Sequence, residues 1–436
     1  PRAGLCPRAA IPQVRSDPSV RRSAAIPPRA SRVAYNETGR FLIGDERYEV
    51  GECPLWVERV NLSDIAESTS ILRSRSSPAQ LVMTFGPTQS LRSGEITRLV
   101  RTSFPESILF GCSTGTTVES RSLSDTNTVA VAIGFDTSWA RVATERIADM
   151  SDSYRAGQAI GLELGGEQLV GVLVLSDGLA VNGSALVNGL KNTLPEHVKI
   201  SGGLAGDGAQ FADTLVTVGD LAESGLIAAV GLYGPSLRMT HEAAGGWDEF
   251  GPVRMITRSD DSILYELDGK PALDLYETYL GDEAAALPAS ALLYPLKIWD
   301  PASPDDEVVR TVLSVDHARR SMKFAGDIPQ GWKARLMRGS FERLIDSAAE
   351  AADSAKSQME NQSSYDGLCL IVSCVGRRLL MGQQTEEEID VVYSSIGGSF
   401  PIVGFYSYGE ILANSKTGPS GLHNQTITLT MISEVA

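Results

Sequence analysis

The sequence has few cysteines, few basic residues and no long apolar run. Five cysteines scattered over 436 residues do not make a disulfide framework, and this usage is typical of a reducing compartment. No apolar stretch approaches the roughly 18 residues that a membrane-spanning helix needs. The 38 Lys and Arg stand against 54 Asp and Glu, for a formal charge of -16. We therefore expect a soluble, cytoplasmic protein with neither nucleic acid nor membrane among its partners.

The N-terminal region differs in composition from the rest of the chain. Residues 1–34 contain seven Arg, no Lys and one Asp, with many Pro, Ser and Ala. We interpret this segment as a disordered Arg/Pro-rich extension or as a targeting segment, which would place the protein in an organelle. Residues 35–78 are an uncertain linker with strand-like pieces at 40–43 and 55–60.

Residues 79–258 contain an internal duplication of one strand-helix-strand-strand unit. Apolar runs at 80–85 and 170–175 are each followed by a helical stretch, a second strand and a Gly-rich turn, at 111–115 and 202–206. Two further strand-like runs follow each turn, and a helix over 153–164 separates the copies. We expect a ligand cleft near the two Gly-rich turns, since loops beyond strand ends can present backbone donors. Tight turning alone also explains such glycines.

Residues 259–436 predict a second domain with strands and helices. Helices are expected over 272–280 and 340–359, the latter from its 3.6-residue apolar spacing. Thr385 and Glu388 predict a capping box that opens a helix at 386. Residues 368–375 and 426–431 read as strands. The fold class is thus α/β (α+β), with two mixed-sheet domains and packed helices.

Three patterns bear on whether the chain could carry a catalytic residue, a metal or a cofactor. Residues 111–115 match the G-x-S-x-G nucleophile motif around Ser113, but β-branched residues follow where that motif needs a helix. Cys369 and Cys374 are offset so that a strand directs them to opposite faces, which disfavours a metal site. His241, expected in a Gly-rich loop with an aromatic neighbour, is a candidate haem ligand or a surface loop histidine.

The C-terminal third places polar groups at strand ends. Arg377 ends a buried strand, Glu410 lies among hydroxyl-bearing residues, and His423 and Asn424 precede the last strand. Such groups could hold the carboxylate and ammonium of a small amphoteric molecule. An internal network, with Arg377 paired to Glu410 and Asn424 capping a turn, is the alternative.

Six short segments in this order resemble the FIST family. They are residues 111–115, 202–207, 267–272, 374–377, 404–410 and 423–426. The resemblance covers the chain from about residue 79 to its end and implies a FIST N-terminal-like domain over 79–258 and a FIST C-terminal-like domain over 259–436. It implies a sensory module of intracellular signal transduction that binds small molecules such as amino acids.

The resemblance and the residue patterns together define the expected site. We expect no cofactor and no enzymatic activity, and a separate signalling output protein as partner. The alternatives are a haem-binding nitric oxide sensor with His241 as ligand and, less favoured, a serine esterase using Ser113. The candidate ligand-binding residues are Gly111, Cys112, Ser113, Thr114, Gly115, Gly202, Gly203, Gly206, Asp207, Arg377, Tyr408, Glu410, His423 and Asn424.

Overall fold

The computed structural model describes residues 42–43, 46–47, 55–60, 62, 78–360, 367–397, 400–413 and 420–435. The chain divides into two compact units, Pro1–Glu52 and Cys53–Ala436. The described part of the first unit is the antiparallel pair β1 (Leu42–Ile43) and β2 (Glu46–Arg47). The predicted extension over 1–34 lies outside the described residues, as does most of the predicted linker.

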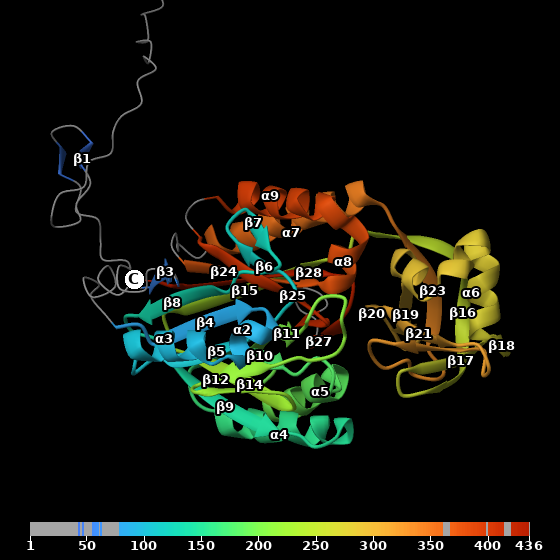
Figure 1. Ribbon diagram of the computed structural model, residues 1–436, viewed down its shortest axis with the longest axis horizontal. Coiled ribbons are helices and arrows are strands. Elements are labelled where there is room, and N and C mark those ends of the chain that lie inside the picture. The colour runs from blue at the N-terminus through green and yellow to red at the C-terminus, as the bar shows by residue number, and fades with distance from the viewer. Residues whose placement is uncertain are drawn as a thin grey trace, which may run out of the picture. The chain divides into compact units, whose positions relative to one another are not determined.

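Three six-stranded sheets in the second unit have the same strand order. Each is built on a module of two parallel strands, a hairpin and an antiparallel strand (Figure 1). The first module is β4 (Leu81–Gly86), β5 (Ile108–Ser113), β6 (Thr117–Glu119), β7 (Ser122–Ser124) and β8 (Val129–Phe135). The second is β10 (Leu169–Ser176), β11 (Lys199–Leu204), β12 (Val216–Val218), β13 (Leu221–Glu223) and β14 (Leu226–Tyr233). The third is β24 (Gly367–Cys374), β25 (Ile402–Ser407), β26 (Gly409–Ala413), β27 (Ser420–His423) and β28 (Ile427–Glu434).

Each module places its hairpin in the sheet of another module. Hairpin β12–β13 pairs with β5, β26–β27 pairs with β11, and β6–β7 pairs with β25, so the exchange closes in a ring. At the opposite edge of two of the sheets, a further strand pairs antiparallel with the last strand of the module. Strand β9 (Trp139–Arg146) pairs with β14, and β15 (Leu237–Ala244) pairs with β28. The corresponding place beside β8 is taken by β3 (Leu55–Arg59). The three sheets thus share one strand order, with one module contributing the central strands of each.

The inner faces of the three sheets share one hydrophobic core. It contains Phe85 and Phe110 of the first module, Leu173 and Val230 of the second and Phe405 of the third, all buried. The strands β4 and β24 are buried along their whole length, and β10 is buried at every residue except Val170, which explains why they read as continuous apolar runs.

Helices cover the outer faces of the sheets. Helix α3 (Glu95–Ser103) follows the short α2 (Thr88–Arg92) in the first module. Helices α4 (Ser153–Leu164) and α5 (Gly183–Thr193) share a core with the second sheet, and α7 (Phe341–Glu360) and α9 (Thr385–Ile396) share one with the third. The predicted helices over 153–164, 272–280 and 340–359 are present. The capping box is absent: Thr385 is already helical and its Oγ1 donates to the carbonyl of Gly382, and Glu388 is paired with Arg377.

Residues 247–339 form a lobe inserted between β15 and α7. Its strands lie in the order β20-β19-β23-β16-β17-β22-β21 and enclose a separate core against α6 (Ala272–Leu280). The bounds are β16 (Trp247–Asp260), β17 (Ile263–Leu267), β18 (Lys270–Pro271), β19 (Leu296–Asp300), β20 (Ser303–Arg310), β21 (Val312–Asp316), β22 (Ser321–Phe324) and β23 (Lys333–Gly339). Within the described residues, the remaining short helices are η1 (Met150–Asp152), η2 (Gly281–Ala286), η3 (Ala289–Leu293), α8 (Val375–Met381) and η4 (Gly382–Gln384). The expected boundary between residues 258 and 259 falls inside β16.

Candidate functional site

The corners that follow β5, β11 and β25 meet through backbone hydrogen bonds. The amide of Gly206 donates to the carbonyl of Ser113 over 2.9 Å, and the amide of Tyr408 donates to Leu204 over 3.1 Å. The amide of Tyr406 donates to the carbonyl of Thr116 over 3.0 Å, so each corner is hydrogen-bonded to the other two. The Gly-rich segments 111–115 and 202–206 are therefore neighbours, and the third module adds residues 404–410.

Gly115 permits a close approach between the first two corners. A Cβ at this position would lie 2.3 Å from the Cα of Gly208 and 2.4 Å from its amide nitrogen. Gly208 itself has a positive φ of 75°. The two backbones thus pack at a distance that only glycine allows.

A hollow of about 800 Å³ opens at these corners. All three modules contribute to it: the start of α2 and the first corner, the loop after β11, and helix α8 with Tyr406. We call it the central hollow. Its lining residues are Pro87, Thr88, Gln89, Arg92, Thr114, Gly115, Thr116, Asp125, Asp207, Gly208, Ala209, Gln210, Asp213, Val375, Arg378, Leu379, Gly382 and Tyr406.

Charged groups of both signs line the central hollow. Arg92 pairs with Asp213 at 2.6 Å, and the two side chains are 55% and 44% exposed. Arg378 lies 3.5 Å from Asp125, which also accepts a hydrogen bond from Thr116 Oγ1 over 2.6 Å. Both arginines pair with solvent-accessible carboxylates, and such pairs are weak. Arg378 is held in addition by a hydrogen bond from its Nη1 to the carbonyl of Gly382 over 2.6 Å.

The loop after β11 forms one wall of the central hollow and is held by two of the predicted residues. The Asp207 carboxylate accepts hydrogen bonds from the amides of Phe211, Ala212 and Asp213 over 2.8–2.9 Å. The Tyr408 hydroxyl donates to the same carboxylate. The Phe211 ring, 46% exposed, stacks on Tyr408 at 4.6 Å between centroids. Asp207 and Tyr408 therefore shape this wall.

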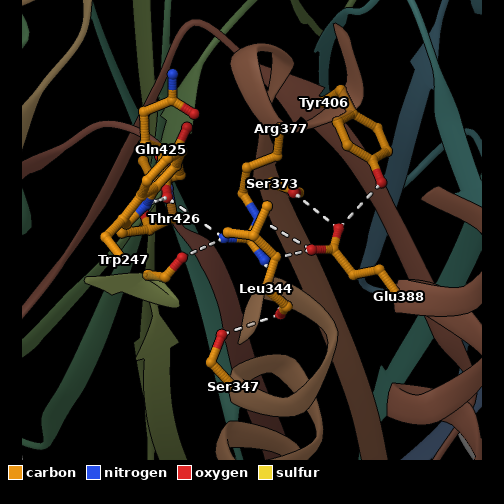
Figure 2. A network of polar contacts seen from close by, with 11 residues as sticks. Trp247, Leu344, Ser347, Ser373, Arg377, Glu388, Tyr406, Gln425 and Thr426 are labelled. Atoms are coloured by element: carbon orange, nitrogen blue, oxygen red, sulfur yellow. Dashed lines mark hydrogen bonds and ion pairs between the residues drawn. The ribbon is translucent and has the colours of Figure 1, made fainter. Parts of the chain in front are cut away.

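Arg377 does not face the central hollow. Its side chain has no exposed surface and is paired with Glu388, which is equally buried (Figure 2). Its remaining N–H groups donate to the carbonyls of Gly245, Gln425 and Leu344 over 2.6, 3.4 and 3.1 Å. All five donors of the guanidinium are used inside the protein. The anticipated internal network is present, but its carboxylate is Glu388 and not Glu410.

Glu410, His423 and Asn424 are also buried. The Glu410 carboxyl accepts hydrogen bonds from Ser407 Oγ, from Thr426 Oγ1 and from the Thr426 amide, and burial raises its pKa to about 7. Burial, together with Arg310, lowers the pKa of His423 to about 4. Of the predicted residues, Thr114, Gly115 and Asp207 line the central hollow, and Tyr408 supports it.

The remaining predicted residues lie in or beside the strands that lead to the corners. Gly111, Cys112 and Ser113 belong to β5, and Gly202 and Gly203 belong to β11, whereas Gly206 follows it. None of these lines the central hollow. They fix its floor through the packing of the strands.

Ser113 and His241, the residues of the catalytic and haem alternatives, are both buried and do not line the central hollow. Ser113 is fully buried, and its Oγ accepts a hydrogen bond from the Leu215 amide over 2.9 Å. His241 lies in strand β15 and not in a loop, and its burial, together with Lys199, lowers its pKa to about 4. It does not line the central hollow. The described part of the chain contains no group of three potential metal ligands.

Four charged residues of the central hollow were missed by the sequence reasoning: Arg92, Asp125, Asp213 and Arg378. Arg92 and Asp213 resemble ordinary surface residues in a helix and a loop. Of these four, Arg378 alone could have been identified from the sequence, since it directly follows Arg377 at the end of a buried strand.

Comparison with known proteins agrees with the expected family. A FIST N domain matches residues 80–270, and a FIST C domain matches residues 272–413. The chain is a FIST domain protein. FIST domains are associated with small-ligand sensing in signal transduction. The family boundary near residue 271 lies within the lobe, so both family domains of this FIST protein contain part of it.

The comparisons with curated proteins and with solved structures give no information on activity. No curated protein matches the chain. Among solved structures, the crystal structure of a cyanuric acid hydrolase from A. caulinodans is similar with a TM-score of 0.35 and 9% identity, over 88% of this chain and 99% of that one. Likeness at this level carries no conclusion about activity. Within the described residues of the FIST protein, no helix is long and apolar enough to cross a membrane.

Proposed function

We propose that this FIST domain protein senses a small molecule bound in the central hollow. The supporting observation is the hollow itself, with a volume of about 800 Å³ and walls from all three modules. A volume of this size is in the range of small-molecule sites. A ligand there touches three modules at once, so its binding energy can favour one arrangement of them over another.

The ligand in this proposal is an amino acid or a similar small amphoteric molecule. Arg92 and Arg378 supply cations for a carboxylate, and an arginine can bind a carboxylate through two parallel hydrogen bonds. Asp125 and Asp213 lie beside these arginines and supply acceptors for an ammonium group. These four side chains take over the role that the sequence suggested for Arg377 and Glu410.

The signal in this proposal passes to a separate output protein in the cytoplasm. The three cysteines among the described residues, Cys112, Cys369 and Cys374, are free and buried, as expected in a reducing compartment.

A thermal-shift screen with amino acids and small organic acids tests the proposal. A ligand at a hundred times its dissociation constant adds about 2.7 kcal/mol to the free energy of unfolding. We expect a hit whose shift is lost in Arg378→Ala and reduced in Arg92→Ala. Arg258→Ala, which removes an exposed arginine of the lobe paired with Glu266, is the matched control. A screen without a hit, or a hit that both hollow variants keep in full, contradicts the proposal.

A further inference from the structure

Helix α8 has one side toward the central hollow and another toward the buried ion pair. Arg378 and Leu379 line the central hollow. Arg377, their neighbour in the same helix, has no exposed surface and is paired with Glu388. Any displacement of α8 by a ligand therefore acts on both sites, because a single turn of helix carries both arginines.

Arg377 holds the two chain segments that connect the lobe to the modules. Its Nη1 donates to the carbonyl of Gly245, two residues before the lobe, over 2.6 Å. Its Nη2 donates to the carbonyl of Leu344, in the first turn after the lobe, over 3.1 Å. Between these contacts lies Gly246, with a φ of 70° and close packing against Leu344. The entry and the exit of the lobe thus meet at one guanidinium.

The carbonyl of Gln425 joins Arg377 to the lobe itself. It accepts a hydrogen bond from Trp247 Nε1 over 2.8 Å and lies 3.4 Å from Arg377 Nη1 (Figure 2). Trp247 is the first residue of β16, and its ring packs against Gly339, the last residue of β23. The first and last strands of the lobe are therefore anchored at the same point.

Tyr406 connects this anchor to the central hollow. It lines the hollow, and its hydroxyl lies 3.4 Å from Glu388 Oε2, while Glu388 Oε1 accepts from Arg377 Nε over 2.9 Å. Tyr406 is 1% exposed, and through its hydroxyl and Glu388 this residue of the hollow lining is joined to Arg377 and the lobe connections. Since all five guanidinium donors are in use, a shift of Arg377 must break or replace at least one buried hydrogen bond.

We propose that Tyr406, Glu388 and Arg377 couple the central hollow to the lobe, so that occupancy of the hollow changes how firmly the lobe is held. This proposal rests on the proposed function only for the identity of the molecule that naturally binds in the central hollow. The coupling itself is a property of the residues named here and can be tested with a synthetic occupant.

The test fills the central hollow covalently and measures amide hydrogen exchange at the lobe connections. In the chain of 436 residues with Cys6→Ser and Cys53→Ser, Gln89→Cys places an exposed thiol in the hollow for labelling with N-phenylmaleimide. We expect a several-fold change of exchange rate in peptides covering 244–250 and 337–347 on labelling. Glu196→Cys, exposed and outside the hollow, is the labelling control and should leave both peptides unchanged.

A second variant separates coupling from general loosening. In Tyr406→Phe, which keeps the ring and removes the contact with Glu388, the response of both peptides to the label at residue 89 should be lost. Unchanged exchange after labelling at residue 89, or an equal response in Tyr406→Phe, overturns the proposal. If the peptides respond while no amino acid or organic acid shifts the melting temperature, the coupling stands and the proposed ligand class is wrong.

Discussion

Arg377 and Glu388 form an ion pair in which neither side chain has exposed surface. The carboxylate of Glu388 is also approached by the hydroxyls of Ser373 and Tyr406. Desolvation makes such a pair costly to build, but removing one partner leaves an uncompensated buried charge.

We predict that Glu388→Gln strongly destabilises the protein. The loss should be about 3–5 kcal/mol, the usual cost of breaking a buried pair, measured by urea denaturation. Asp125→Asn, which weakens the more exposed pair with Arg378, should cost less than about 1 kcal/mol. Equal losses in the two variants would show that burial does not set the strength of the Arg377 pair.

Gly115→Ala should disturb the central hollow. The added Cβ would meet the backbone of Gly208 at 2.3–2.4 Å, and backbone cannot rotate aside as a side chain can. We expect a loss of about 1–3 kcal/mol and faster hydrogen exchange over 207–213. Gly166→Ala, where a Cβ meets nothing within 4 Å, serves as the control. A fully stable Gly115→Ala variant would contradict the close packing of the corners.

Glu410 should make the stability depend on pH. Its pKa is raised to about 7 from an ordinary value of 4.5, so between these values the folded protein binds more protons than the unfolded chain. The stabilising contribution of protonated Glu410 is therefore complete at low pH and is lost as the pH rises through about 7.

Urea denaturation of the protein and of Glu410→Gln between pH 5 and pH 8 checks this prediction. The glutamine variant should gain stability relative to the parent as the pH rises, and the difference should level off above about pH 7. Parallel pH profiles would mean that Glu410 keeps an ordinary pKa despite its burial.

Ser113 should stabilise the fold and take no part in catalysis. Its Oγ accepts a hydrogen bond from the Leu215 amide, so Ser113→Ala leaves a buried donor without a partner and should cost about 1–3 kcal/mol. A fluorophosphonate probe should not label the parent protein. Labelling that disappears in Ser113→Ala would instead revive the esterase hypothesis.

Tyr408→Phe should loosen the wall of the central hollow. The variant keeps the stacking on Phe211 and removes the hydroxyl that donates to Asp207. We expect faster amide exchange over 208–213 with little change elsewhere. Tyr265→Phe, a substitution in the lobe, gives the comparison. Unaltered exchange over 208–213 would show that Asp207 alone holds the loop.

Sequence reasoning located the elements better than the side chains of the site. Continuous apolar runs identified β4, β10 and β24, because strands buried on both faces need no polar alternation. Helical spacing identified α7. The Gly-rich corners near Gly115 and Gly206 were recognised because their residue type reflects backbone geometry that is local in sequence.

The charged residues of the central hollow depend on contacts that local patterns do not encode. Arg92 pairs with Asp213, and Asp125 pairs with Arg378, across modules that are far apart in the chain. The partner of Arg377 was mistaken for the same reason. Glu388 has the spacing of a capping residue, and only the packing of α9 against α8 shows that it is a counter-ion.

The ring of exchanged hairpins makes the three modules mutually dependent for folding. Strand β6 pairs with β25 although most of the chain separates them, so this sheet forms only after nearly all of the polypeptide is available. Such distant pairings slow folding. A fragment limited to either family domain would leave sheet edges without their neighbours, and exposed edges of this kind promote self-association. Genetic fusion or dissection of this protein therefore has to preserve the chain from β3 to β28 as a single piece.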